Sequence, residues 1–330
     1  MKVKVKFKYV LWTLVALVLL YFSFRDMNWK DFVAVLRECR WGFVVLSMVF
    51  GAIANVVRGL RWRLLILPLD PEVKRGRCID GFIIARMADY VIPHSCEFIR
   101  CGFVTSPRLR YDKAIGTVLL ERTWDIFILF LLIIAVLAMR WDLFGTFFSE
   151  KILGPVAGNA PFNLWWVVLA VVAILVAVYA FVPGVRKYFK GIGQGLISFT
   201  KMKNKGLFMI YTLILWTCFV LMTMTIIWSL PGDFGLDLVD GLFIMAVGGI
   251  ASIVPVPGGF GAFHYLVALA LQSIYDIPFE TGIIFATLSH ESQTLMLMIT
   301  GAIAYAYEAL KRPDQKVSVE QVRQDSGRNL

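Results

Sequence analysis

Long apolar stretches alternate with short polar ones along almost the whole chain. The apolar runs that approach the length of a membrane-spanning helix cover residues 9–24, 43–60, 114–139, 164–182, 207–230 and 281–307. A helix needs about 20 predominantly apolar residues to cross the hydrocarbon core of a bilayer. The pattern therefore predicts an all-α polytopic membrane protein with about six spans.

Two more apolar stretches are interrupted by residues that do not continue a helix. The weaker break lies within residues 89–97, around Pro93. The stronger break lies within residues 252–264 and contains Pro255, Pro257, Gly258, Gly259 and Gly261. Proline lacks a backbone donor and clashes with the preceding turn, whereas glycine permits backbone shapes that other residues resist. Unpaired peptide groups are costly in hydrocarbon, so each break either lies outside the membrane or is buried around a polar cavity.

The charges that flank these two stretches differ in sign. Residues 79–105 have Lys and Arg on both sides, whereas residues 241–275 are flanked by Asp240, Asp276 and Glu280. Lys and Arg concentrate in cytoplasmic loops. We therefore expect two re-entrant hairpins that enter from opposite faces. Such an inverted repeat places the binding site of a transporter where its two halves meet.

Basic residues also set the expected orientation. Lysines precede the first run, and Arg58, Arg61 and Arg63 close the second one. This pattern predicts a multi-pass protein of the cell (inner) membrane with both termini in the cytoplasm. Aligning the two halves places the polar residues 121–125 opposite residues 290–294.

The polar segments complete the plan. We expect an outer loop at residues 25–40 and, from apolar positions at helical spacing among basic ones, a surface helix at residues 185–202. We assign residues 1–312 to a single membrane domain and residues 313–330 to a polar cytoplasmic tail without fixed structure.

Composition excludes a soluble globule, because 59% of the residues are hydrophobic and the mean hydropathy is +0.73. The net charge of +10 fits the topology of the loops better than nucleic-acid binding, and we expect no nucleic-acid partner. The five cysteines are scattered without a CxxC pair, so we expect neither disulfides nor a thiolate metal site. Whether several copies associate stays open.

Ionisable residues inside an apolar run are candidate functional residues. Glu121 and Asp125 are four residues apart and share a helix face, with Arg122 beside them. One interpretation is a structural ion pair between helices. The other is that Arg122 binds a lipid phosphate through its planar fork of donors, while the two carboxylates orient it. Arg86 and Arg100 flank the first break and either serve the same purpose or extend to the interface.

The three histidines of the chain, His94, His264 and His290, lie in or beside the two breaks and the last span. With Glu97 and Glu291 they offer metal ligands, but no HExxH or similar helical spacing is present. We favour a proton relay or hydrogen bonds to a lipid headgroup, and expect neither a metal nor a cofactor.

Four motifs together resemble a known family. They are RWRLL at 61–65, Ile92-Pro93 followed by Glu97 and Arg100, Glu121-Arg122-x-x-Asp125, and VPVPGGFG at 254–261. On these motifs the chain, from about residue 8 to residue 311, resembles the lysylphosphatidylglycerol synthase transmembrane region, a family of flippase-like proteins. It departs from the family's pattern at Asp89 and Cys96, and at His290 and Glu291, where relatives often carry Arg.

The resemblance implies movement of a lipid with a polar or charged headgroup between leaflets. It places the site, by motif position, on Glu97, Arg100, Glu121, Arg122, Asp125, Pro257, Gly258, Gly259 and Gly261. The aminoacyl-transfer domain of the full synthase has no counterpart in this chain, so we expect no lipid aminoacylation.

The leading hypothesis is therefore a lipid flippase or transporter whose partner is a phospholipid or other polar lipid. An alternative is an intramembrane enzyme that uses the His and Glu residues on a lipid-linked substrate. A third is a receptor or assembly factor, which predicts that loss of Glu121 or Arg122 has no effect.

Overall fold

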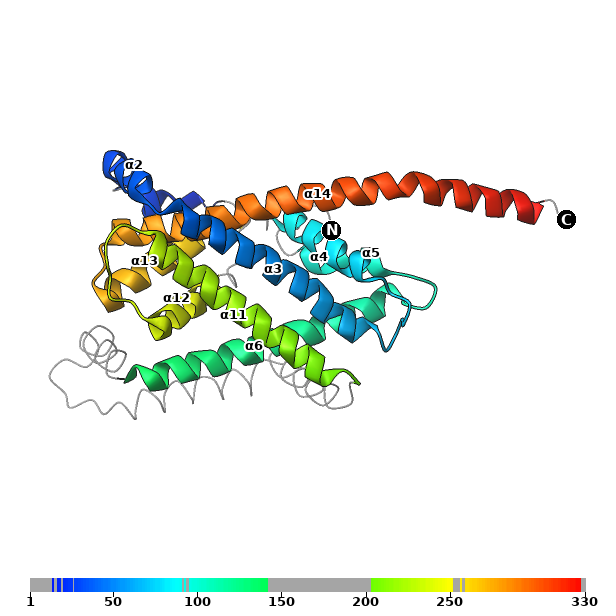
Figure 1. The fold of residues 1–330 in the computed structure, drawn as a ribbon, viewed down its shortest axis with the longest axis horizontal. Coiled ribbons are helices and arrows are strands. Elements are labelled where there is room, and N and C mark those ends of the chain that lie inside the picture. Colours follow the sequence, from blue (N-terminus) through cyan, green and yellow to red (C-terminus); the bar gives the residue numbers. More distant parts are fainter. Residues whose placement is uncertain are drawn as a thin grey trace.

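The computed structural model describes residues 14, 17–18, 20–25, 27–90, 92, 95–141, 203–251, 256 and 259–327, without the side chains of residues 31 and 311–327. Every regular element in these ranges is a helix (Figure 1). The helices whose bounds the structure describes are α2 (Trp29–Glu38), α3 (Trp41–Ile66), α4 (Arg75–Asp89), α5 (Cys96–Val104), α6 (Tyr111–Met139), α11 (Lys205–Ser229), α12 (Leu238–Ala251), α13 (Ala262–Tyr275) and α14 (Phe279–Gly327). The predicted all-α class is confirmed.

Helices α3, α6 and α11 are long and apolar enough to cross a membrane. They coincide with three predicted spans. The helices α3 and α11 are antiparallel neighbours, because Arg40 N at the start of α3 donates to Ser229 O at the end of α11, at 2.8 Å. The predicted run at 164–182 and the surface helix at 185–202 lie outside the described residues, and the number of spans stays a prediction.

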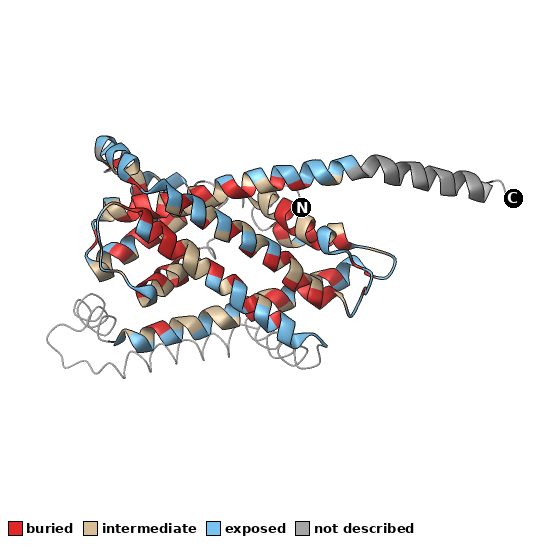
Figure 2. Cartoon of the chain, viewed as in Figure 1, coloured by how far each residue is buried: buried red, intermediate tan, exposed pale blue. Residues whose placement is uncertain are grey.

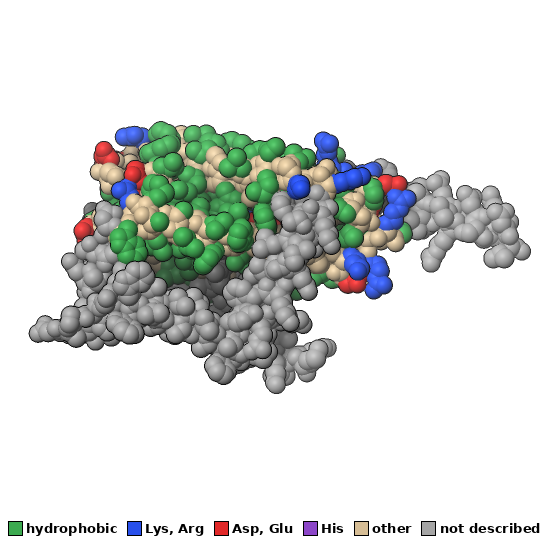
Figure 3. All heavy atoms as spheres, turned by 90° about the horizontal axis from the view of Figure 1, so that it is seen from below, with side chains coloured by type: hydrophobic (Ala, Val, Ile, Leu, Met, Phe, Trp, Pro, Cys, Tyr) green, Lys and Arg blue, Asp and Glu red, His purple; other side chains and the backbone are tan. Residues whose placement is uncertain are grey.

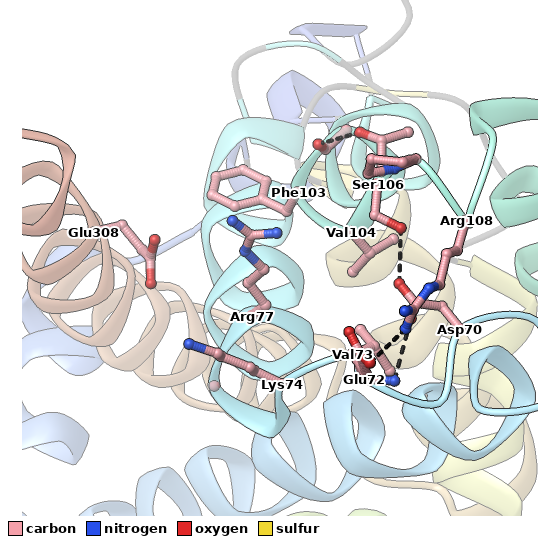
Figure 4. A pocket seen from close by; sticks show the side chains of 14 residues that line it. Asp70, Glu72, Val73, Lys74, Arg77, Phe103, Val104, Ser106, Arg108 and Glu308 are labelled. Carbon is pink, nitrogen blue, oxygen red and sulfur yellow. Dashed lines mark hydrogen bonds and ion pairs between the residues drawn. The ribbon is translucent and has the colours of Figure 1, made fainter. Parts of the chain in front are cut away.

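Helices α4 and α5 form a pair that opens at one end of the molecule. The start of α4 and the end of α5 line a common cavity of about 790 Å³, with Arg77 and Phe103 facing it (Figure 4). At the closed end, the Asp89 carboxylate accepts from Cys96 N at 3.2 Å. The first amides of a helix lack partners within it, so Asp89 caps α5 from across the break.

Helices α12 and α13 form a second pair that opens at the other end. The rings of Phe243, near the start of α12, and Tyr275, at the end of α13, lie 6.1 Å apart. At the closed end, Gly259 and Gly261 have φ angles of 80° and 79°. Residues with a Cβ rarely adopt this left-handed region, so the turn into α13 depends on glycine. The structure thus contains the two broken helix pairs that the sequence predicts.

Helix α14 contacts both pairs. Gly282 lies against the backbone of Ala268 in α13, and Gly301 lies against Met87 in α4. Gln293 Nε2 also donates to Ser47 O of α3 at 3.0 Å. Helix α14 therefore joins the two pairs across the middle of the molecule.

The same helix continues to Gly327, through the residues for which the sequence predicts a tail without fixed structure (Figure 1). A helical stretch without tertiary contacts is marginal in water. Disorder of the tail in solution stays a prediction.

The outward side of the bundle is apolar. Large hydrophobic side chains such as Leu119, Leu213 and Ile303 are exposed, and buried and exposed positions alternate along the helices (Figure 2). On the face seen in Figure 3, a belt of hydrophobic side chains lies between charged side chains at the two ends. A belt of this kind is the surface of a membrane protein, since hydrocarbon and not water covers it.

One predicted loop is wrong. Residues 25–40 contain α2, whose start is capped by Asn28 Oδ1 accepting from Lys30 N at 3.1 Å. Phe32, Val35 and Leu36 recur at helical spacing and pack on a core shared with α13 and α14. Charged residues interrupt this apolar face in the sequence, so a search for long hydrophobic runs did not predict the helix.

The contact between α13 and α14 predicts a strong effect of adding a methyl group. A Cβ on Gly282 would lie 2.8 Å from the Ala268 Cα, so the two backbones would have to separate. We expect Gly282→Ala to destabilise the protein by about 1–3 kcal/mol, the usual range for overpacking. Thermal unfolding in detergent measures it.

Gly116 in α6 provides the control, because a Cβ there meets nothing within 4 Å. Gly116→Ala should be neutral or stabilise by up to about 1 kcal/mol, since alanine favours helix. Equal behaviour of the two variants would contradict the close contact.

Candidate functional site

A buried group of charges connects α3, α5 and α6. Glu121 of α6 is at its centre, with Oε1 accepting from Arg61 Nη2 at 3.2 Å and Oε2 accepting from Arg100 Nη1 at 2.7 Å. The side chains of all three residues are at most 2% exposed. A buried charge is tolerated only when it is paired and hydrogen-bonded. Glu121 therefore forms ion pairs with arginines from two other helices, α3 and α5.

Asp125, one turn further along α6, extends this group. Its Oδ1 lies 2.7 Å from Arg61 Nη2, and its Oδ2 accepts from Arg58 Nη2 at 3.3 Å. The side chains of Arg58 and Asp125 are slightly exposed, at 15% and 13%. The charges thus run from the sealed interior toward a more open edge.

Aromatic rings complete the environment of Arg100. Its guanidinium lies 4.8 Å from the ring centroid of Trp62 and 5.5 Å from that of Phe82. Trp62 is itself fixed by donating from Nε1 to Thr117 Oγ1 at 2.9 Å. Cation–π contacts of this kind hold an arginine in a dry site. Of the two interpretations of Glu121, the geometry supports the structural ion pair.

The pair formed by Arg122 and Glu97 differs in its access to the surface. Arg122 Nη2 donates to Glu97 Oε1 at 2.6 Å, and the two side chains are 34% and 26% exposed. Glu97 lies in the first turn of α5, immediately after the first break. This ion pair is therefore a charged position beside the break that an outside molecule can reach.

Its depth can be estimated from helix geometry. Arg122 is eleven residues into α6, which starts at Tyr111. At about 1.5 Å per residue it lies about 16 Å along the helix. The hydrocarbon core of a bilayer is about 30 Å thick. The pair is thus near the level of the membrane midplane if α6 spans the bilayer.

A second polar group lies on α13 and α14. Glu291 Oε1 is 3.0 Å from His290 Nδ1 and 3.7 Å from His264 Nε2. His264 is buried, whereas the Glu291 side chain is 41% exposed. His290 is eleven residues into α14, which starts from the opposite end of the molecule to α6. The group is therefore at a depth similar to that of Arg122.

Residues at the edges of the two breaks meet beside His290. The rings of Tyr90, at the end of α4, and Phe260, just before α13, lie 6.3 Å apart. Phe260 lies 5.0 Å from the His290 ring, and Thr294 Oγ1 donates to the Tyr90 hydroxyl at 3.0 Å. Residues at the edges of the two breaks thus come together, whereas residues 93–94, 252–255 and 257–258 lie outside the described residues, and the convergence of the breaks themselves stays a prediction.

The predicted site residues thus divide into two groups. Glu97, Arg100, Glu121, Arg122 and Asp125 belong to the first, on α5 and α6, and His264, His290 and Glu291 to the second. Arg86 lies on α4, before both groups in sequence, and its Nε is buried without a hydrogen-bond partner. Gly259 and Gly261 form the turn before α13. His94, Pro257 and Gly258 lie outside the described residues.

The sequence analysis did not identify several residues that contact these two groups. It assigned Arg58 and Arg61 to the cytoplasmic end of α3, but both contact α6, and Arg61 is completely buried. Their partners lie more than 50 residues away, so local patterning could not indicate them. Tyr90 and Phe260 carried no signal beyond their places next to the breaks.

The chain matches the family described as the lysylphosphatidylglycerol synthase TM region over residues 9–301. A comparison with curated proteins finds no significant match, and neither does one with solved structures. The match covers the buried charges and both breaks. It also covers His264, His290 and Glu291, which we call the histidine group. This chain belongs to the lysylphosphatidylglycerol synthase transmembrane-region family.

Proposed function

We propose that this protein moves a lipid with a polar or charged headgroup between the leaflets of the cell membrane. The observation that carries the proposal is the partly exposed Arg122–Glu97 pair beside a helix break. A sealed structural pair would resemble Glu121, which is 1% exposed. An accessible charge pair at this depth is costly without a polar occupant, since hydrocarbon cannot solvate it.

The geometry suggests how a headgroup is held. Arg122 has donors besides the one that contacts Glu97, and a planar guanidinium suits the oxygens of a phosphate. Glu97 accepts, and so suits an ammonium group or the hydroxyls of a headgroup. The acyl chains stay along the apolar outer surface of the bundle. A groove between the two broken pairs would then pass the headgroup from one end to the other.

The orientation belongs to the same proposal. Lys74, Arg77 and Arg108 lie at the open end of the α4–α5 pair. Asp233, Asp237 and Asp276 lie at the open end of the α12–α13 pair. The positive-inside rule then places the first end, and both termini, in the cytoplasm. The two pairs would be re-entrant hairpins from opposite faces.

Reconstituted vesicles test the proposed activity. The purified protein is incorporated into liposomes with fluorescent lipids that carry anionic, zwitterionic or cationic headgroups. A membrane-impermeant quencher then reports how fast inner-leaflet lipid becomes accessible, with and without a pH gradient. We expect faster exchange than in protein-free vesicles for at least one headgroup class.

Arg122→Ala should reduce this rate by about tenfold or more, which corresponds to about 1.4 kcal/mol or more of lost interaction. Arg110→Ala is the matched control, since Arg110 contacts Asp112 near the start of α6 with an 80% exposed side chain. Wild-type protein that never exceeds the protein-free rate would reject lipid movement. Equal rates for both variants would remove Arg122 from the site.

The same samples test the alternative that the protein is an intramembrane enzyme. Mass spectrometry of the vesicle lipids before and after the assay should show unchanged lipid masses for a transporter. A new lipid species that disappears in His290→Ala would favour an intramembrane enzyme instead.

A further inference from the structure

The histidine group has the composition of a metal site that no sequence spacing indicated. One ligand atom each from His264, His290 and Glu291 can be chosen so that all lie within 4.8 Å of one another. The ligands come from two helices, α13 and α14, and only His290 and Glu291 are adjacent in sequence. This is why a search for HExxH or similar spacing could not find them.

The separations are close to those of zinc coordination. Zinc bonds to histidine nitrogen and carboxylate oxygen are about 2.0–2.2 Å long, so tetrahedral ligand atoms lie about 3.3–3.5 Å apart. Glu291 Oε1 is 3.0 Å from one imidazole nitrogen and 3.7 Å from the other. These two distances bracket the required value, and small side-chain rotations bring the atoms into position.

The two ring nitrogens of His264 differ in their surroundings. It is only 1% exposed, and its Nδ1 is buried without a hydrogen-bond partner. Its Nε2 is 3.7 Å from Glu291 Oε1, which is beyond hydrogen-bond distance. A buried polar atom without a partner is costly and needs an explanation. A cation between His264 and Glu291 would give Nε2 a partner, whereas Nδ1 would carry the ring proton and stay without an acceptor.

Rings hold this imidazole in place. The ring centroids of Phe24 and Phe263 lie 5.9 and 6.3 Å from that of His264. On the other side, Glu291 is 41% exposed, so the group is open to an additional ligand. Two histidines, one carboxylate and an open position form the donor set of catalytic zinc centres, whereas calcium and magnesium prefer oxygen ligands alone.

We propose that His264, His290 and Glu291 bind one divalent metal ion of the zinc type. The ion would link α13 to α14 beside the second break. A Cβ on Gly259 would lie 3.4 Å from His290 Nε2, so the metal would also lie near the glycine turn. Metal binding of this kind does not depend on lipid movement, and its test needs no transport assay.

The full-length protein purified in detergent and stripped with a chelator is the starting material. After dialysis against zinc chloride, atomic emission should show one zinc per chain. Cobalt chloride in place of zinc should give the visible d–d absorption of a tetrahedral nitrogen and oxygen site. Zinc should also raise the unfolding temperature, because a ligand that binds only the folded state stabilises it.

Glu291→Gln and His290→Ala should weaken zinc binding by at least about tenfold, since loss of a supporting outer-shell contact alone costs about 10–100-fold. Glu280→Gln is the matched control, because Glu280 is an exposed acid in the first turn of the same helix. It should retain the zinc content, the cobalt spectrum and the stabilisation by zinc.

Two results would overturn the proposal. One is wild-type protein that retains no zinc after dialysis. The other is a Glu291→Gln variant that elutes as a folded, monodisperse species and binds zinc as tightly as the wild type. If His290→Ala fails to fold, the glutamine variant decides alone, because it preserves the size of the side chain.

Discussion

Replacing Glu121 with glutamine should destabilise the protein by about 3–5 kcal/mol, the usual cost of removing one partner from a buried ion pair. Arg61 and Arg100 both donate to this carboxylate, and both are 0% exposed. Glutamine can still accept through its amide oxygen, but among the described residues it leaves Arg100 without a counter-charge and Arg61 with Asp125 alone.

Thermal and denaturant unfolding in detergent measure this effect. Glu97→Gln is the comparison, since Glu97 pairs with Arg122 where both side chains remain partly exposed. Water or a lipid headgroup can solvate Arg122 after that change, so the loss of stability should be much smaller. Equal losses would show that Glu121 is not the centre of the buried group.

Comparing Arg122→Ala with Glu121→Gln distinguishes an effect on lipid transport from an effect on stability. Arg122→Ala should leave unfolding nearly unchanged and still slow lipid exchange, because its pair is accessible. Glu121→Gln should lower the amount of folded protein, and with it the total activity. Glu121 is then a positioning residue that holds α3 and α5 against α6, not a group that touches the lipid.

The sequence predicts the helices and the breaks well, because both are local properties. The long apolar runs at 43–60 and 207–230 correspond to α3 and α11, since hydrocarbon imposes a minimum length on a span. Proline and glycine stop helices for reasons of backbone geometry alone. The two broken pairs therefore follow from residues next to one another in the chain.

The contacts of the charges could not be predicted in the same way. Arg58 and Arg61 stand at the end of an apolar run, where arginine usually extends to the interface. Their partners Asp125 and Glu121 are on another helix, and only the packing of α3 against α6 brings them together. Similarly, aligning the two halves paired Glu121 with His290, but each has different neighbours in the structure.

Gly259→Leu should abolish lipid exchange while leaving the protein in the membrane. Gly259 has a φ angle of 80°, and a Cβ there would lie 3.4 Å from His290 Nε2. The larger leucine side chain would extend into the place where Tyr90, Phe260 and His290 converge. If the headgroup passes between the two breaks, leucine at this position would obstruct it.

A loss of lipid exchange caused by backbone strain must be distinguished from one caused by filling the space between the two breaks. A residue with a Cβ in the left-handed region costs about 1–2 kcal/mol, wherever it is. Gly235 has a φ angle of 62° and nothing within 4 Å of a Cβ, so Gly235→Leu introduces comparable strain without filling the space between the breaks. We expect it to exchange lipid at the wild-type rate.

The measurement is the quenching assay in vesicles with equal amounts of each folded variant. Gly259→Ala should give an intermediate rate, because its methyl group only reaches contact distance from His290. A full rate for Gly259→Leu would show that lipid does not pass between the breaks. Equal loss in Gly235→Leu and Gly259→Leu would assign the effect to strain, because only Gly259 lies beside the histidine group.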